Sequence, residues 1–243
     1  MKITKWITLI LIISITASCK KDDKENDSIE PNDFLSANHY NELVVEIQSM
    51  EGYTPTQGTL DNLKSFLEGL LNKPSGISIT SNTIGAQGKG TYSLDDIEDI
   101  EKDNRTQNTK DRKIAAYILF LDGEYSGNDA NGKVLGIQYD PTSMVIFEKT
   151  IKNLTGGLGQ PSTQVVETSV VEHEFGHTLG LTNNGTDMKT AHQDTEHGAH
   201  CNVKSCLMYY ATETSNFIAN LAGGTVPELD AQCKADLKAN GGK

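Results

Sequence analysis

The stretch HEFGHTLG, residues 173–180, constrains the fold of this chain more than any other segment. It lies within residues 161–181, which have a proline near the start and a glycine near the end, as helices often do. On a helix, His173 and His177 stand one turn apart on one face. The roughly opposite face carries Val171, Phe175 and Leu179. We therefore expect a helix that packs its apolar stripe on a sheet and presents two imidazoles toward a cleft.

The chemistry of this helix points to a metal. Imidazoles at positions i and i+4 are close enough to bind one zinc ion. Glu174 lies between His173 and His177 and is offset in angle, so it can reach a water molecule at the metal without being a ligand. A catalytic zinc site needs a third protein ligand. The loop after the helix offers His192, Asp194, His197 and His200 for that role.

The segment HEFGHTLGL resembles the metzincin metalloproteases, whose pattern HExxHxxGxxH is followed by a tight turn that contains a methionine below the metal. Gly180 matches the family glycine, where the chain must turn sharply and a left-handed conformation is needed. Asn183 occupies the position of the third histidine in that pattern, and an amide oxygen is a poor zinc ligand. The missing ligand must therefore come from elsewhere.

Residues 200–210, HCNVKSCLMYY, resemble the archaemetzincin pattern His-Cys-x4-Cys-x-Met, which in that group directly follows the glycine and two spacer residues. In this chain the insertion 182–199 separates the two halves. The resemblance implies that His200 is the third zinc ligand and that Met208 forms the methionine turn. His197 stays open as an alternative ligand, because it lies three residues before His200.

The resemblance also suggests roles for Tyr210 and for the three cysteines that follow residue 200. Tyr210 resembles the tyrosine that approaches the metal in astacins and serralysins and can support the oxyanion; a purely structural tyrosine is the alternative. In archaemetzincins a later Cys-x-x-Cys helps to bind a second zinc. This chain has Cys233 and Asp236 in place of that pair, and a second zinc site would use them together with Cys201 and Cys206. We favour a disulfide among the three cysteines over a second zinc, because exported proteins tend to pair their thiols, but the sequence does not fix the partners.

The N-terminus predicts an exported lipoprotein. Two lysines, an apolar run and small residues precede Cys19, which implies a signal peptide over residues 1–18 and a lipidated Cys19. An ordinary cleaved signal or a membrane anchor is the alternative. Residues 19–35 are polar and charged and predict a disordered tether. They resemble the lysine-then-acid signals of Bacteroides lipoproteins, so we expect lipid anchoring at the bacterial outer membrane, with the cell surface as a candidate location.

The charge balance limits the partners of this chain. Removal of residues 1–18 takes away Lys2 and Lys5 and no acid, so the formal charge moves from -12 to -14. A nucleic acid or an anionic membrane surface would require the opposite sign. We therefore expect no nucleic-acid partner, membrane contact only through the lipid anchor, and a monomer that acts on a protein or peptide substrate.

The remaining patterns predict an α+β fold over a single domain, residues 36–243. Strands are expected at 41–50, 76–84, 113–121, 134–139 and 143–151, and helices at 59–73, 93–104, 161–181 and 227–240. The run 113–121 is apolar throughout, so we place it at the centre of the sheet. This order is that of a metzincin-like mixed, twisted sheet with packed helices, an active-site helix, and a loop-rich C-terminal subdomain ending in a helix.

The resemblance implies a zinc-dependent endopeptidase. Three imidazoles would leave zinc one open position for water, and Glu174 would take the water's proton as general base and return it to the leaving amine. An extended substrate would pair with the edge strand at 134–139. A glutamate ligand of the gluzincin type is not expected, because Glu196 and Glu213 lie in loop-like sequence. The alternative function is a surface-anchored, zinc-containing binding protein without proteolytic activity.

Overall fold

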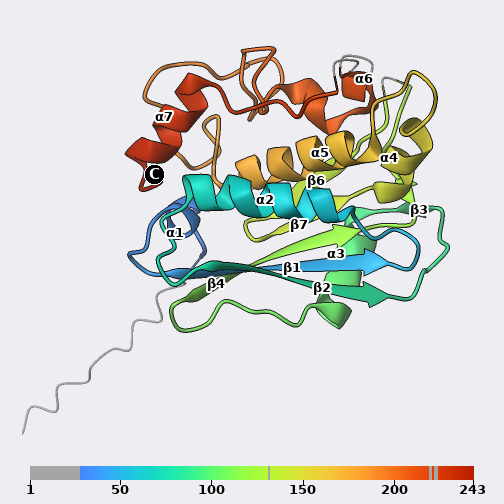
Figure 1. Ribbon diagram of the computed structural model, residues 1–243, viewed down its shortest axis with the longest axis horizontal. Helices are drawn as coiled ribbons and strands as arrows, with labels where there is room; N and C mark the ends of the chain where they lie inside the picture. The colour runs from blue at the N-terminus through green and yellow to red at the C-terminus, as the bar shows by residue number, and fades with distance from the viewer. Residues whose placement is uncertain (1–27, 131, 219–220, 222–223) are drawn as a thin grey trace, which may run out of the picture.

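The computed structural model describes residues 28–130, 132–218, 221 and 224–243 (Figure 1). The signal peptide, Cys19 and most of the tether lie outside the described residues. The strands are β1 (Glu42–Met50), β2 (Ile77–Ile84), β3 (Thr91–Tyr92), β4 (Lys113–Phe120), β5 (Glu124–Tyr125), β6 (Gly136–Asp140) and β7 (Ser143–Ile146). The helices are α1 (Pro31–Leu35), α2 (Gln57–Leu70), α3 (Leu94–Asn104), α4 (Glu148–Leu154), α5 (Thr163–Thr178), the short 3₁₀ helix η1 (Tyr210–Glu213), α6 (Ser215–Ile218) and α7 (Ala231–Ala239).

The main sheet has five strands in the order β2-β1-β4-β7-β6. Its first four strands run parallel, and β6 pairs antiparallel with β7 at one edge. This is the mixed α+β architecture that the sequence predicts. β4 lies at the centre of the sheet as expected. Its two faces pack into two separate hydrophobic cores. Ile114, Ala116, Ile118 and Phe120 enter one core, and Tyr117, Leu119 and Leu121 enter the other.

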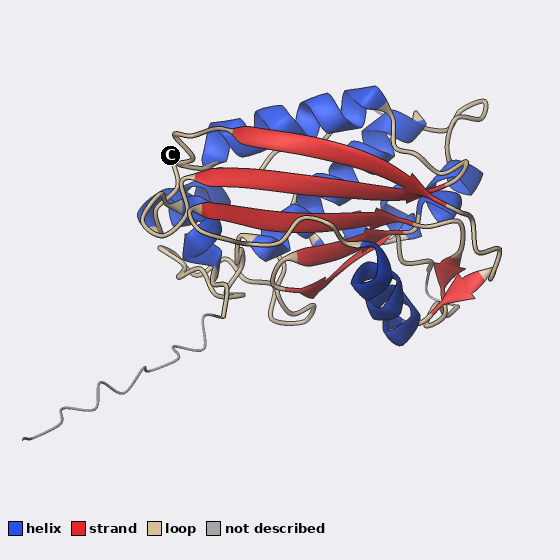
Figure 2. Ribbon diagram, turned by 90° about the horizontal axis from the view of Figure 1, so that it is seen from below, coloured by secondary structure: helices blue, strands red, loops and turns tan. Residues whose placement is uncertain are grey.

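Helices cover both faces of the sheet (Figures 1 and 2). α2 and α5 lie side by side on one face, and α3 covers part of the other. α3 begins with a capping box: the Ser93 side chain accepts a hydrogen bond from the N–H of Asp96, and the Asp96 side chain accepts one from the N–H of Ser93. Ile97 and Ile100 of α3 pack into the second core.

The loop-rich C-terminal segment runs over the side of α5 that faces away from the sheet, as the orange and red ribbon in Figure 1 shows. Every residue from 166 to 178 of α5 is therefore buried. A helix buried on all sides carries its polar side chains into the interior, where they need specific partners. The two histidines and Glu174 of α5 lie between the sheet and this C-terminal segment.

Two sequence-based boundaries are wrong. The strand expected over residues 143–151 ends at Ile146, and helix α4 follows. Ile151 and Leu154, three residues apart, both pack on the main core, a helical spacing that a strand cannot provide. Residues 31–35, expected to be part of the disordered tether, instead form α1, and Phe34 and Leu35 are fully buried in the core. Across the described residues, no helix is both long and apolar enough to cross a membrane.

Candidate metal centre

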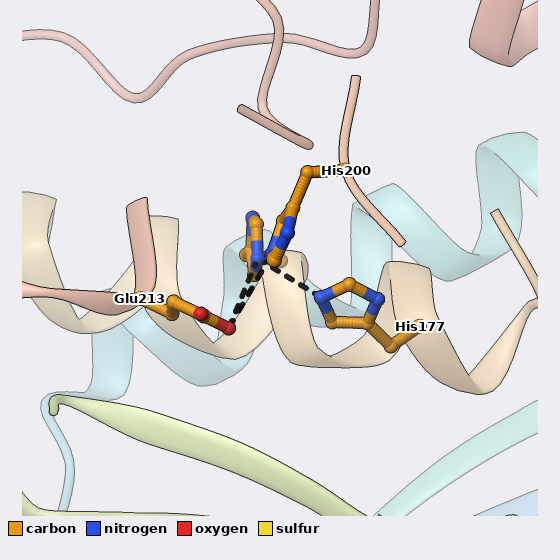
Figure 3. A group of neighbouring side chains, drawn as sticks. His177, His200 and Glu213 are labelled. Carbon is orange, nitrogen blue, oxygen red and sulfur yellow. Dashed lines mark hydrogen bonds and ion pairs between the residues drawn. The ribbon is translucent and has the colours of Figure 1, made fainter. Parts of the chain in front are cut away.

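Three imidazoles converge beside α5. His173 Nε2 and His177 Nε2 lie 3.1 Å apart, one helical turn from each other. The His200 ring stacks on His173, with ring centroids 5.3 Å apart, and meets His177 edge-on at 5.0 Å. Figure 3 shows His177 and His200 pointing toward one another from two different segments of the chain. The structure thus brings together the three histidines that the sequence and its resemblance single out.

The path of the insertion explains why His200 reaches this place. The helix ends at Gly180, which adopts φ +73° and has no room for a side chain, because a Cβ atom would lie 2.7 Å from Pro31 and from the backbone of Thr186. The Thr182 hydroxyl then donates a hydrogen bond to the carbonyl of Ala199. Residues 182–199 therefore form a loop, the excursion, whose first and last residues are joined by a hydrogen bond. His200 follows directly after this loop.

Asn183 and His197, the two other candidates near this position, point elsewhere. Asn183 lies in the excursion and donates from Nδ2 to the side-chain oxygen of Gln193 at 3.3 Å. His197 stacks on Tyr210 with ring centroids 3.6 Å apart, and its Nδ1 lies 2.7 Å from Asp194. The backbone carbonyl of His197, and not its side chain, contacts the site, because it accepts a hydrogen bond from His200 Nδ1 at 2.6 Å.

Backbone carbonyls fix the orientation of two of the imidazoles. His173 Nδ1 lies 2.7 Å from the carbonyl of Leu207, and His200 Nδ1 lies 2.6 Å from that of His197. With each Nδ1–H donated to a carbonyl, the proton is held there and the Nε2 lone pair is free. The Nε2 atom of His200 is buried and has no hydrogen-bond partner among the described residues. Three imidazole Nε2 atoms that converge at one point, one of them without a partner, are what a zinc ion requires, so the donor set fits the metal.

Glu174 lies next to these imidazoles and contacts the edge strand. Its side chain is 1% exposed, and its Oε2 atom accepts a hydrogen bond of 2.8 Å from the N–H of Gln138 in β6. Its Oε1 atom is buried and has no hydrogen-bond partner among the described residues. The carboxylate is thus held by one oxygen and keeps the other free.

A second carboxylate, which sequence reasoning does not expect, completes the group. Glu213 ends η1, and its Oε2 atom lies 3.4 Å from His200 Nε2 and 3.8 Å from His173 Nε2 (Figure 3). The ligand atoms of Glu213 and the three histidines all lie within 4.8 Å of one another. The sequence offers no signal for this residue beyond its place a few positions after Met208, since the segment lacks any periodic pattern.

Burial and charge control protonation at the site. Burial lowers the pKa of His173 to about 4, and burial with the neighbouring His173 and His200 lowers the pKa of His177 well below its usual value. Burial also acts to lower the pKa of His200, but the Glu213 carboxylate outweighs it and the net pKa is raised. Burial and then the charge of Glu213 raise the pKa of Glu174 well above its usual value. Neutral imidazoles on α5 suit metal binding at neutral pH.

Met208, the expected turn methionine, packs against α5, because a Cβ atom at Gly176 would lie 2.3 Å from its sulfur. It is fully buried, and its carbonyl accepts a hydrogen bond of 2.7 Å from the N–H of Cys201. Tyr210, two residues later, stacks on His197. The side chain that reaches the histidines from this segment is that of Glu213.

Beside this site, three buried cysteines form a second cluster. Cys206 Sγ lies 3.6 Å from Cys233 Sγ, and Cys201 Sγ lies 3.4 Å from His192 Nδ1. All three thiols are free in the structure, and their mutual hydrogen bonds lower the pKa of Cys206 and raise that of Cys233. One set of atoms within 4.8 Å of one another belongs to His192, Cys201, Asp230 and Cys233. Asp236, expected near this cluster, contacts His192 Nε2 at 2.7 Å.

Solved structures of similar fold include an archaemetzincin from Methanopyrus kandleri, with a TM-score of 0.53 and 13% sequence identity over 82% of this chain and 96% of that one. A zinc-dependent peptidase from Methanocorpusculum labreanum gives 0.47 and 12%, over 79% of this chain and 99% of that one. Metalloproteinase-II from Bacteroides fragilis gives 0.46 and 16%, over 84% of this chain and 54% of that one. No protein-family model matches the sequence, and no curated protein sequence does. The likeness to the archaemetzincin establishes the fold.

Proposed function

We propose that this protein is a zinc-dependent endopeptidase. The observation that carries the proposal is the convergence of the His173, His177 and His200 imidazoles beside Glu174, whose Oε1 atom is buried and free. A site that only stored zinc would have no need of a general base beside it. The archaemetzincin fold is consistent with this reading, although fold alone does not fix an activity.

In this proposal His173, His177 and His200 hold the metal, which supplies Lewis acidity and lowers the pKa of water. Glu174 accepts the proton of the attacking water at Oε1 and delivers it to the leaving amine. Its burial raises its pKa and makes it a stronger base than an ordinary carboxylate. The hydrogen bond from the Gln138 N–H holds the other oxygen and orients the side chain.

The substrate would lie extended along β6. This strand pairs with β7 on one side and forms the edge of the sheet on the other. The N–H of Gln138 points from β6 to Glu174, so the open edge faces the base. A peptide that adds to this edge would use its backbone for pairing and would pass Glu174.

Binding without catalysis is the second candidate, and one observation favours it. Glu213 joins the three histidines, and four protein ligands are typical of structural zinc sites. A surface-anchored, zinc-containing binding protein would have such a site. The free oxygen of Glu174 favours the enzyme instead.

We also propose that the protein is exported and anchored through a lipid on Cys19, on the basis of its N-terminal sequence. In an oxidising compartment Cys206 and Cys233, whose sulfurs lie 3.6 Å apart, would be the pair to form a disulfide. The alternative is a second zinc held by the cysteine cluster. Counting thiols in the denatured protein, together with the zinc content of the native protein, separates these states.

The function is tested by incubating the purified protein with an unbiased peptide library. We expect cleavage that stops when zinc is removed with a chelator and returns when zinc is added back. Cleavage that persists without metal, or a zinc-loaded protein that cleaves nothing in the library, would contradict the proposal.

A further inference from the structure

Glu213 is held beside the three histidines by its own backbone. Its carbonyl accepts a hydrogen bond of 2.8 Å from the N–H of Leu135, just before β6. The next residue, Thr214, forms an isolated antiparallel bridge with Val134. Glu213 therefore lies along the same sheet edge that a peptide would join, immediately before the part of the edge that remains open.

The distances of Glu213 fit those of a metal ligand. With zinc–nitrogen and zinc–oxygen distances of about 2.0–2.2 Å, two ligands of a tetrahedral zinc lie about 3.3–3.5 Å apart. Glu213 Oε2 lies 3.4 Å from His200 Nε2 and 3.8 Å from His173 Nε2, and the two helix nitrogens lie 3.1 Å apart. The carboxylate thus stands where a fourth donor would stand.

No basic residue accounts for this position. In the described part of the chain, the ion-pair contacts of Glu213 are made to His173 and His200, and neither a lysine nor an arginine contacts its carboxylate. The side chain is 31% exposed, whereas that of His173 is fully buried. Glu213 therefore reaches the histidines from the solvent side.

We propose that Glu213 is a fourth, displaceable protein ligand that closes the zinc site until a peptide binds along β6. This proposal rests on the proposed function, because it assumes that the three histidines hold zinc. A carboxylate in the open position keeps solvent and small anions from the metal. A peptide that pairs with the edge of β6 next to Leu135 would push the Glu213 side chain aside and expose the position.

The experiment compares the wild type with Glu213→Gln, using the cobalt-loaded protein, whose visible absorption reports the ligands of the metal. Azide, a small anion that binds open metal positions, is titrated into each. We expect Glu213→Gln to respond at azide concentrations at least tenfold lower than the wild type. Loss of a charged ligand should also weaken zinc binding in a chelator competition. Glu196→Gln, in an exposed part of the excursion, is the matched control and should behave as the wild type does.

Several outcomes separate this proposal from the proposed function. If Glu213→Gln keeps the azide response and zinc affinity of the wild type, Glu213 is not a ligand, and the function stands as long as His200→Ala loses zinc. If the wild type binds neither zinc nor cobalt, both proposals fail. Should Glu213→Gln not fold, Glu213→Asp keeps the charge on a shorter chain, and we expect an azide sensitivity above that of the wild type. An unchanged response would overturn the proposal.

Discussion

The sulfur of Met208 packs directly against the backbone of Gly176, between the two histidines of α5: a Cβ atom at Gly176 would lie 2.3 Å from Met208 Sδ. Met208 and α5 therefore touch at a point where only glycine fits. Gly176→Ala should lower the free energy of unfolding by about 1–3 kcal/mol, because the turn must shift. Thermal unfolding measures this effect.

Gly69→Ala is the control, since this α2 glycine is exposed and a Cβ atom there meets nothing within 4 Å. Alanine favours a helix over glycine by up to about 1 kcal/mol, so this variant should be as stable as the wild type or more stable. Equal effects of the two substitutions would mean that the contact with Met208 carries no cost.

Glu174→Gln should retain stoichiometric zinc and lose most of the turnover. The amide cannot accept a proton, but it is close in shape to the carboxylate and removes no ligand. Zinc content and the rate of peptide cleavage are measured on the same sample. A variant that cleaves at the wild-type rate would exclude Glu174 as the base.

His200→Ala should lose zinc to a moderate chelator, since two imidazoles bind the metal more weakly by several kcal/mol than three do. His197→Ala should largely keep zinc, because the contact to His200 comes from the backbone carbonyl of residue 197, which the substitution preserves. Asn183→Ala should keep it as well. Retention by His200→Ala together with loss by His197→Ala would reverse the assignment.

The stability of the protein should fall as the pH rises above about 5, in part because of Glu148. Glu148 is fully buried, neither of its oxygens has a hydrogen-bond partner among the described residues, and Lys152 Nζ lies 3.5 Å from Oε1. Burial and then the charge of Glu167 raise the pKa of Glu148 above its usual 4.5. The folded state thus keeps a proton that the unfolded state releases, so the unfolding free energy decreases with rising pH in this range.

Glu148→Gln cannot release that proton. Its unfolding free energy should decline less steeply with pH, by up to about 1.4 kcal/mol per pH unit. Urea unfolding at pH 5, 7 and 9 measures the slopes, with the exposed Glu98→Gln as the control. Parallel slopes for Glu148→Gln and the wild type would show that Glu148 is ionised in the folded state.

Cys19→Ser should release the protein from membranes or block its maturation, because the thiol is the proposed site of lipid attachment. Metabolic labelling with a fatty-acid probe, followed by membrane fractionation, measures this. Equal labelling of the wild type and the variant would remove the lipoprotein assignment.

Much of the fold follows from local patterns in the sequence. The uninterrupted apolar run of β4, the Ser93 and Asp96 pair at the start of α3 and the four-residue spacing along α5 each predict the element that forms. The prediction of a strand beyond Ile146 is wrong because the apolar positions of residues 143–151 suit both a strand and a helix. Packing of Ile151 on the main core favours the helix α4. The burial of Phe34 and Leu35 is not predictable from the sequence, because two apolar residues after a charged run show neither a helical nor a strand periodicity.

The sequence by itself determined the helix that carries His173, Glu174 and His177, since a spacing of four residues places side chains on one helical face wherever that helix lies. Its resemblance to a known pattern also singled out His200. Only the tertiary structure placed the imidazole of His200, and not that of His197, beside His173 and His177, where the bond between Thr182 and Ala199 closes the excursion, and only it brought Glu213 to these histidines. Long-range contacts, which no local periodicity encodes, determine where loop residues lie. Which loop side chains contact the histidines of α5 is therefore known only from the tertiary structure.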